Sequence, residues 1–314
     1  MKYLKCAIVV GFFTVAVGPV LAIPLVYEEG ANIGQVFTTG EITIKMTAFD
    51  VGTVYPALGP AGTSVGYSGP PGAGVGGGVT AVDGIAGQTP ASGALPVGVY
   101  PGPEDTWGIG KITRIQDANG DAIWTSAGKQ AELTVYFWGE QDFFVEQMDS
   151  GNQRIDGVGM HFDIYEEPLP SATAFNATGG TASRTPANTY PTVTDGILVL
   201  SGVSAAGFIN GPGVAGGLAT EFESRFNATS LTGDGEAYIS LIGGTDMAQF
   251  DTDYFISPFG LGNADFRVQF DTSPTNVADW LVTADDPVKG YVPEPASLSL
   301  LILGGLVMIC RRRR

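Results

Sequence analysis

The chain has 314 residues, 46 of them glycine, and its 15 Lys and Arg against 32 Asp and Glu give a net charge of −17. This charge argues against nucleic acid and anionic membrane surfaces as partners, and it favours neutral, cationic or metal-bridged ones. Both cysteines, Cys6 and Cys310, lie in terminal apolar segments. Because no cysteine lies between them, the body of the protein cannot contain a disulfide scaffold, a thiol nucleophile or a cysteine metal site.

Residues 1–22 have the features of a secretory signal peptide. Lys2 and Lys5 precede an apolar run that ends at the small residue Ala22, where signal peptidase would cut. If these two lysines and the four C-terminal arginines are removed, 9 basic residues remain against 32 acidic ones, a net charge of −23. The expected body, residues 23–290, is long enough for one large all-β domain.

Alternating and aromatic segments predict that this body is mainly β, folded as a β-sandwich or jelly roll. Along residues 34–50, Ile42, Ile44, Met46 and Ala48 lie on one side and polar residues on the other, as in a half-buried strand. Two segments, 133–138 and 143–147, are expected to pair over a turn at Gly139-Glu140. The first and last strands are expected to be neighbours. The other expected strands are residues 109–116, 122–125, 157–166, 196–202, 220–226, 236–242, 265–270 and 279–283.

Two stretches interrupt these strands. Residues 56–103 hold 14 glycines and 8 prolines in 48 residues, a density of breakers that predicts a long insertion or linker without regular structure. An elastic or self-associating segment is the functional alternative. A second irregular stretch is expected over residues 168–194.

The last 24 residues, 291–314, have three parts in fixed order. Val292-Pro293-Glu294-Pro295 is followed by an uncharged apolar run, residues 296–310, and then by Arg311, Arg312, Arg313 and Arg314. Fifteen helical residues would reach ~22 Å, which is a short span for a hydrocarbon core of ~30 Å. The positive-inside rule would keep the arginines in the cytoplasm and place the body across the membrane.

This tripartite tail resembles the PEP-CTERM sorting signal of Gram-negative bacteria, and similar tails also occur on some ice-binding proteins. The resemblance implies that an exosortase in the inner membrane cuts near the Pro-Glu-Pro motif and releases the body to the cell envelope or an extracellular matrix. The resemblance covers only the tail, and it implies where the protein is delivered, not which activity it has. The plain alternative is a tail anchor with a chance Pro-Glu-Pro.

Two acidic groups could bind calcium through carboxylate oxygens. Asp117, Asn119 and Asp121 have the spacing of the first three ligands of a calcium loop, but the Gly and Glu that such a loop needs later are absent. Asn119-Gly120 is also a strong hairpin signal, so a polar hairpin tip is the simpler interpretation. The second group is Asp246, Asp251 and Asp253, for which a solvated loop is the simpler interpretation.

No convincing catalytic constellation is present, so we expect a non-enzymatic protein. His161, the one histidine, is expected at a surface or edge, since a zinc site would need three more ligands. A secreted carbohydrate- or calcium-binding module is the alternative function, and a glycan hydrolase with two facing carboxylates is a third class. A carbohydrate-binding module would stack sugar rings on a platform of exposed aromatic side chains. The aromatic residues of this chain could form such a platform, or they could equally be buried in the core: Trp107, Trp124, Trp138, Trp280, Tyr136 and Tyr238.

Overall fold

The computed structural model describes residues 40–55, 57–66, 104–128, 131–149, 151–169, 172–184, 188–210, 220–260 and 262–292. All of them belong to the unit Pro24–Pro293. The predicted signal peptide with Ala22, residues 67–103 of the insertion and the tail from Pro293 onward lie outside these ranges. Among the described residues, no helix is both long and apolar enough to cross a membrane.

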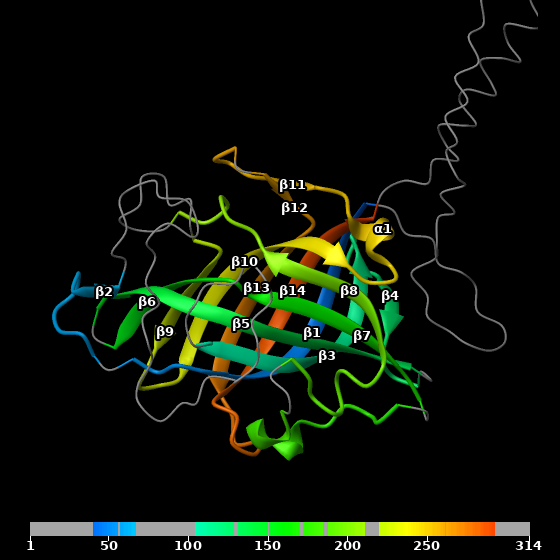
Figure 1. The fold of residues 1–314 in the computed structure, drawn as a ribbon, viewed down its shortest axis with the longest axis horizontal. Helices are drawn as coiled ribbons and strands as arrows, with labels where there is room; N and C mark the ends of the chain where they lie inside the picture. The colour runs from blue at the N-terminus through cyan, green and yellow to red at the C-terminus, as the bar shows by residue number, and fades with distance from the viewer. Residues whose placement is uncertain are drawn as a thin grey trace, which may run out of the picture. The chain divides into compact units, whose positions relative to one another are not determined.

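Strands dominate the described residues, which confirms the prediction of a mainly β body (Figure 1). Helical structure in these ranges is limited to the short turns η1 (Ala177–Gly179), η2 (Thr181–Ser183) and α1 (Met247–Phe250). The strands are β1 (Gly40–Gly52), β2 (Ser64–Gly66), β3 (Thr106–Asp117), β4 (Ala122–Thr125), β5 (Ala131–Gln147), β6 (Asn152–Val158), β7 (His161–Pro168), β8 (Ile197–Ser204), β9 (Phe222–Asn227), β10 (Thr232–Gly243), β11 (Phe255–Ile256), β12 (Asn263–Ala264), β13 (Phe266–Pro274) and β14 (Val282–Val292).

All strands except β11 and β12 belong to one antiparallel sheet that closes on itself. Its pairing runs β3-β1-β14-β13-β10-β8-β7-β5, and β5 pairs again with β3. β6 and β9 pair with each other and bridge the remaining lengths of β5 and β10. β1 and β14 pair from Gly40–Val292 to Asp50–Val282. The expectation that the first and last strands are neighbours is therefore confirmed.

Side-chain alternation fills the space inside this closed sheet. On β1, Ile42, Ile44 and Met46 face the interior, whereas Lys45 between them is exposed. Figure 1 shows β7 and β8 in front of β1 and β14, and apolar side chains from both walls meet in one core cluster. Fully burying one such side chain contributes about 1.5–3 kcal/mol. The alternation predicted for β1 is therefore the pattern that builds the core.

A second apolar cluster lies on the outer face of β1, β3 and β5. There, residues 172–184 and 188–194, which we call the cover segment, pack over the sheet. Trp280 lies at the centre of the cluster, with its ring centroid 5.2 Å from that of Trp107. Its Nε1 donates a hydrogen bond to the carbonyl oxygen of Ala177 at 2.7 Å. The described residues of the predicted irregular stretch thus form a cover on the sheet.

The sequence predicts a turn at Gly139 and an unbroken strand across Gly159, and both predictions are wrong. Gly139 has a positive φ of 82°, yet β5 continues through it and changes partner from β7 to β6. Gly159 has a similar φ of 80°, and there the expected strand 157–166 divides into β6 and β7. Glycine allows this conformation in bulges and in turns alike. The neighbouring strands decide which of the two forms.

The last strand is longer than expected. β14 begins at Val282, after Trp280, and continues to Val292. Tyr291 and Val292, which the sequence placed in the tail segment, pair with Glu41 and Gly40 of β1. The described part of the sheet therefore extends to Val292, the residue before Pro293.

Candidate functional site

The predicted hairpin between β3 and β4 is confirmed, and its acidic residues serve the turn. Asp117 Oδ1 accepts hydrogen bonds from the amides of Asn119 and Asp121, each at 2.9 Å. Asp117 Oδ2 also accepts from Asn119 Nδ2 at 3.3 Å. These bonds explain the side chains of Asp117 and Asn119 without a metal ion. The polar hairpin tip is the interpretation that the geometry favours.

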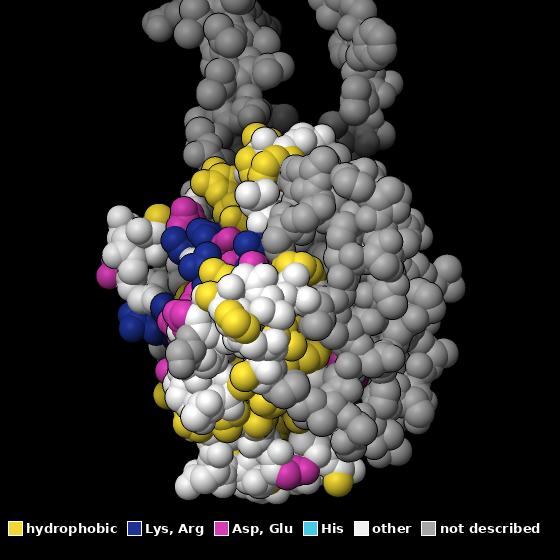
Figure 2. All heavy atoms as spheres, turned by 90° about the vertical axis from the view of Figure 1, so that its left-hand side faces the viewer, with side chains coloured by type: hydrophobic (Ala, Val, Ile, Leu, Met, Phe, Trp, Pro, Cys, Tyr) yellow, Lys and Arg dark blue, Asp and Glu magenta, His cyan; other side chains and the backbone are white. Residues whose placement is uncertain are grey.

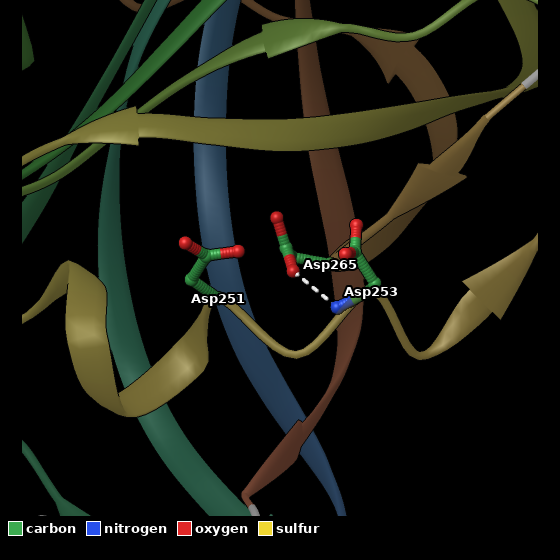
Figure 3. Close-up of side chains that lie close together, drawn as sticks. All are labelled: Asp251, Asp253 and Asp265. Carbon is green, nitrogen blue, oxygen red and sulfur yellow. Dashed lines mark hydrogen bonds between the residues drawn. The ribbon is translucent and has the colours of Figure 1, made fainter. Parts of the chain in front are cut away.

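The second acidic group comes together in part (Figure 3). Carboxylate oxygens of Asp251, Asp253 and Asp265 lie within 4.8 Å of one another between α1 and β13. Asp246 is not a member of this group. The third member of the cluster is Asp265 instead of Asp246. Asp265 lies at the start of a predicted strand, and nothing in the sequence indicated that it would join the cluster. Three clustered carboxylates are ligands that Ca²⁺ accepts.

Asp265 has a structural task within this cluster. It is buried, and its Oδ1 accepts from the amides of Thr252 and Asp253 at 2.7 and 2.8 Å. Its Oδ2 accepts from the amide of Leu241 at 2.8 Å. Burial and the neighbouring charges of Asp265 and Asp253 raise the pKa of Asp251 above its ordinary value. A cation would relieve this repulsion between the exposed carboxylates.

His161 is buried, so its predicted place at a surface or edge is wrong. β7 lies between β5 and β8, and the imidazole stacks on the indole of Trp138 with ring centroids 4.3 Å apart. Asp163, two residues along the strand, accepts hydrogen bonds from Trp138 Nε1 at 3.0 Å and from Ser201 Oγ at 2.6 Å. Burial lowers the pKa of His161. This cluster is part of the protein's packing.

The aromatic residues considered for a sugar platform do not form one. All four tryptophans and Tyr136 are buried, and only Tyr238 is partly exposed. Trp124 belongs to the interior core, and the other three tryptophans belong to the cluster on the outer face. Their apolar area stabilises the fold, as the alternative interpretation held.

A buried polar network that the sequence did not reveal joins both ends of the insertion to β5. Tyr55 Oη donates to Asp142 Oδ2 at 2.7 Å, and the amide of Asp142 donates to Asp105 Oδ2 at 2.9 Å. Thr53 Oγ1 donates to Asp105 Oδ1 at 3.0 Å. Thr53 and Tyr55 precede the insertion and Asp105 follows it. The network therefore fixes the base of the insertion to the sheet.

Glu140 is the most isolated acid in this network. It is fully buried, and among the described residues neither carboxyl oxygen has a hydrogen-bond partner, although Asp142 and Thr106 lie beside it. A Cβ at Gly157 would lie 1.6 Å from Glu140 Oε1, so only glycine leaves room for this carboxyl group. Burial, together with the charges of Asp142 and Asp105, raises the pKa of Glu140 well above its ordinary value.

The raised pKa of Glu140 favours its protonated form beside Asp142. Asp142 Oδ1 is likewise without a hydrogen-bond partner among the described residues. Both carboxyl groups are buried. The chain matches no protein-family model, no curated protein and no solved structure. Its candidate sites are therefore interpreted from their own geometry.

Proposed function

We propose that this chain is an exported, non-enzymatic protein of the envelope or extracellular matrix of a Gram-negative bacterium. Signal peptidase removes residues 1–22, and the apolar segment 296–310 holds the precursor in the inner membrane. An exosortase then acts near Pro293-Glu294-Pro295 and releases the body, which associates with extracellular polysaccharide or biofilm. Its strongly acidic composition keeps the released protein soluble.

The position of the sorting motif relative to the sheet carries this proposal. β14 ends at Val292, which pairs with Gly40 of β1, and Pro293 follows directly. A cut after Val292 would leave every described strand of the closed sheet complete, because β14 runs from Val282 to Val292. Removal of the tail is thus compatible with a stable mature body.

Replacing Pro293, Glu294 and Pro295 together with alanine is expected to prevent release. The wild-type protein should be found outside the inner membrane in a shortened form. The triple variant should stay at full length in the inner membrane, as should the wild-type protein in a host without exosortase. Fractionation followed by immunoblotting measures this. The matched control is Asp271→Asn, a substitution at an exposed position on β13, which should be released like the wild-type protein. Full-length wild-type protein in the inner membrane of both hosts would contradict the proposal.

Calcium binding is a second candidate function, favoured by the Asp251–Asp253–Asp265 cluster. We expect binding in the ~10⁻⁴–10⁻³ M range typical of extracellular calcium modules. Asp251→Asn/Asp253→Asn should weaken binding at least about tenfold because two of the three carboxylates lose their charge. Calorimetry with Ca²⁺ measures this, and Asp117→Asn/Asp121→Asn is the control that tests the hairpin tip. If Asp251→Asn/Asp253→Asn binds Ca²⁺ with the same heat and affinity as the wild-type protein, this cluster is not the calcium site.

A further inference from the structure

The short hairpin β11–β12 exposes a group of large apolar side chains. Ile256 is 77 % exposed, and Tyr254 and Phe259 are 42 % and 40 % exposed. Figure 2 shows hydrophobic side chains gathered at the upper end of one face, at the height where Figure 1 places β11 and β12. A group of this kind on a soluble domain marks a contact with another apolar surface. We call these three residues the apolar hairpin patch.

The hairpin is fixed to the sheet and projects from it. Ser240 Oγ on β10 donates to the carbonyl oxygen of Asn263 at 3.0 Å. Phe255 packs edge-on against Tyr238, with ring centroids 5.9 Å apart. Because side chains alternate along a strand, Ile256 points away from the side on which Phe255 is anchored, whereas the ring of Tyr254 lies edge-on to that of Phe255, with centroids 5.1 Å apart. The exposure of the patch is therefore built into the packing of the hairpin.

The patch is close to the point where the chain leaves the sheet toward its tail. The ring of Tyr254 stacks on that of Tyr291, with centroids 4.5 Å apart and planes 9° apart. Tyr291 is the second-last residue of β14, and the apolar run begins five residues later at Ala296. Five extended residues span at most about 17 Å. If residues 296–310 cross a bilayer, Tyr291 must lie within about 17 Å of the point where the chain enters it, and Tyr254 lies directly beside Tyr291.

We propose that the apolar hairpin patch inserts into the interface of the bilayer that holds the precursor, so that the body rests on the membrane before release. This inference rests on the proposed function, because the tail has to be in the membrane. Tyrosine favours the membrane–water interface, where its ring is buried and its hydroxyl stays wet. Tyr254 and Tyr291 would lie at the headgroups and Ile256 and Phe259 below them.

The lipid expected at this surface has an uncharged or zwitterionic headgroup. Asp251 and Asp253, both exposed, directly precede Tyr254 in the chain, so anionic lipid would be repelled. The apolar contact must therefore supply the attraction. The tail raises the local concentration of the patch at the membrane, so modest apolar burial is sufficient for docking. After the tail is cut, this advantage disappears and the body can leave.

Depth measurement on the full chain tests the proposal. The chain, with Cys6 and Cys310 replaced by serine, is reconstituted into phosphatidylcholine nanodiscs with one nitroxide label at Pro258→Cys, in the exposed turn of the hairpin. Relative accessibility to oxygen and to a water-soluble nickel complex should place this label about 5–10 Å below the phosphates. A label at Asn276→Cys, in the turn at the opposite end of β14, should report water.

Two further variants separate the possible outcomes. Ile256→Ser/Phe259→Ser should return the label at residue 258 to water-like accessibility, at least a fivefold rise in nickel collision, whereas Met148→Ser, also an exposed apolar site, should leave it buried. A label at Leu303→Cys reports the tail. If the label at residue 303 is buried but the label at residue 258 is accessible to the nickel complex, this inference alone is overturned. If the label at residue 303 is itself accessible to the nickel complex, the proposed function is overturned. Burial of residue 258 that persists in detergent and depends on protein concentration would assign the patch to a second copy of the chain instead.

Discussion

Raising the pH from 5 to 8 is expected to lower the free energy of unfolding of this protein by about 5 kcal/mol. Burial raises the pKa of Asp50 to about 7. Burial likewise raises the pKa of Asp156 to about 7 against the opposing charge of Arg154. In the unfolded chain these carboxyl groups titrate near pH 4. The native state therefore binds more protons than the unfolded state between these values, and stability present at low pH is lost as the pH rises through 7.

The magnitude follows from linkage. For each group, pH 5 lies two pH units below the pKa in the folded state. Each unit changes the free energy of unfolding by about 1.4 kcal/mol, so the two groups together give about 5 kcal/mol. Glu140, whose pKa burial raises well above its ordinary value, changes stability in the same direction. His161 opposes them, because burial lowers its pKa, but it is a single group.

Urea unfolding at pH 5, 6, 7 and 8, followed by tryptophan fluorescence, measures this dependence. Asp50→Asn should remove about half of it and stabilise the protein at pH 8, since the amide keeps the shape of the carboxyl group without its charge. Asp50 lines a partly open pocket of about 60 Å³ beside Phe222 and Phe270. Asp271→Asn, at an exposed position, should leave the slope unchanged. A midpoint that is constant or rises toward pH 8 would contradict the assignment of these buried acids.

The sequence predicts the elements whose signals are local. Alternation at Ile42, Ile44 and Met46 predicts the inner face of β1, and Asn119-Gly120 predicts the hairpin between β3 and β4; both are confirmed. The sequence fails at Gly139, because a glycine before a polar residue signals a turn and a bulge equally. The partners β6 and β7, which keep β5 extended, are fixed by tertiary pairing alone.

Candidate sites follow the same division. Asp251 and Asp253 are neighbours in the chain and could be grouped from the sequence, whereas Asp265 joins them through the path of the chain back to β13. The buried network joins Tyr55 to Asp142, 87 positions apart, and Asp105 to Asp142, 37 positions apart. Such pairs depend on the register between strands, which no local pattern encodes.

Replacing Trp280 with alanine is expected to destabilise the protein by about 3–5 kcal/mol, because a large buried ring is lost and a cavity is left. The ring contacts Trp107 and Tyr190, with centroids 5.2 and 6.0 Å away. It also holds Ala177 of the cover segment through the hydrogen bond from its Nε1. We therefore expect the cover segment to detach from the outer face of the sheet. Urea unfolding at pH 5, where the protein is expected to be more stable than at pH 8, measures the loss.

Trypsin tests the detachment separately, because the cover segment contains Arg184. In the native protein its guanidinium lies 4.2 Å from the centre of the Trp107 ring and forms a buried ion pair with Glu104, so the side chain that trypsin must bind is not accessible. Trp280→Ala should make this bond sensitive to trypsin at pH values where the sheet is still folded. Trp280→Phe keeps most of the ring but loses the hydrogen bond to Ala177, so we expect a cost nearer ~1 kcal/mol and continued protection of Arg184. Equal cleavage in Trp280→Ala and the wild-type protein would mean that the cover segment is held by its other contacts, with Trp280 contributing only to the core beneath it.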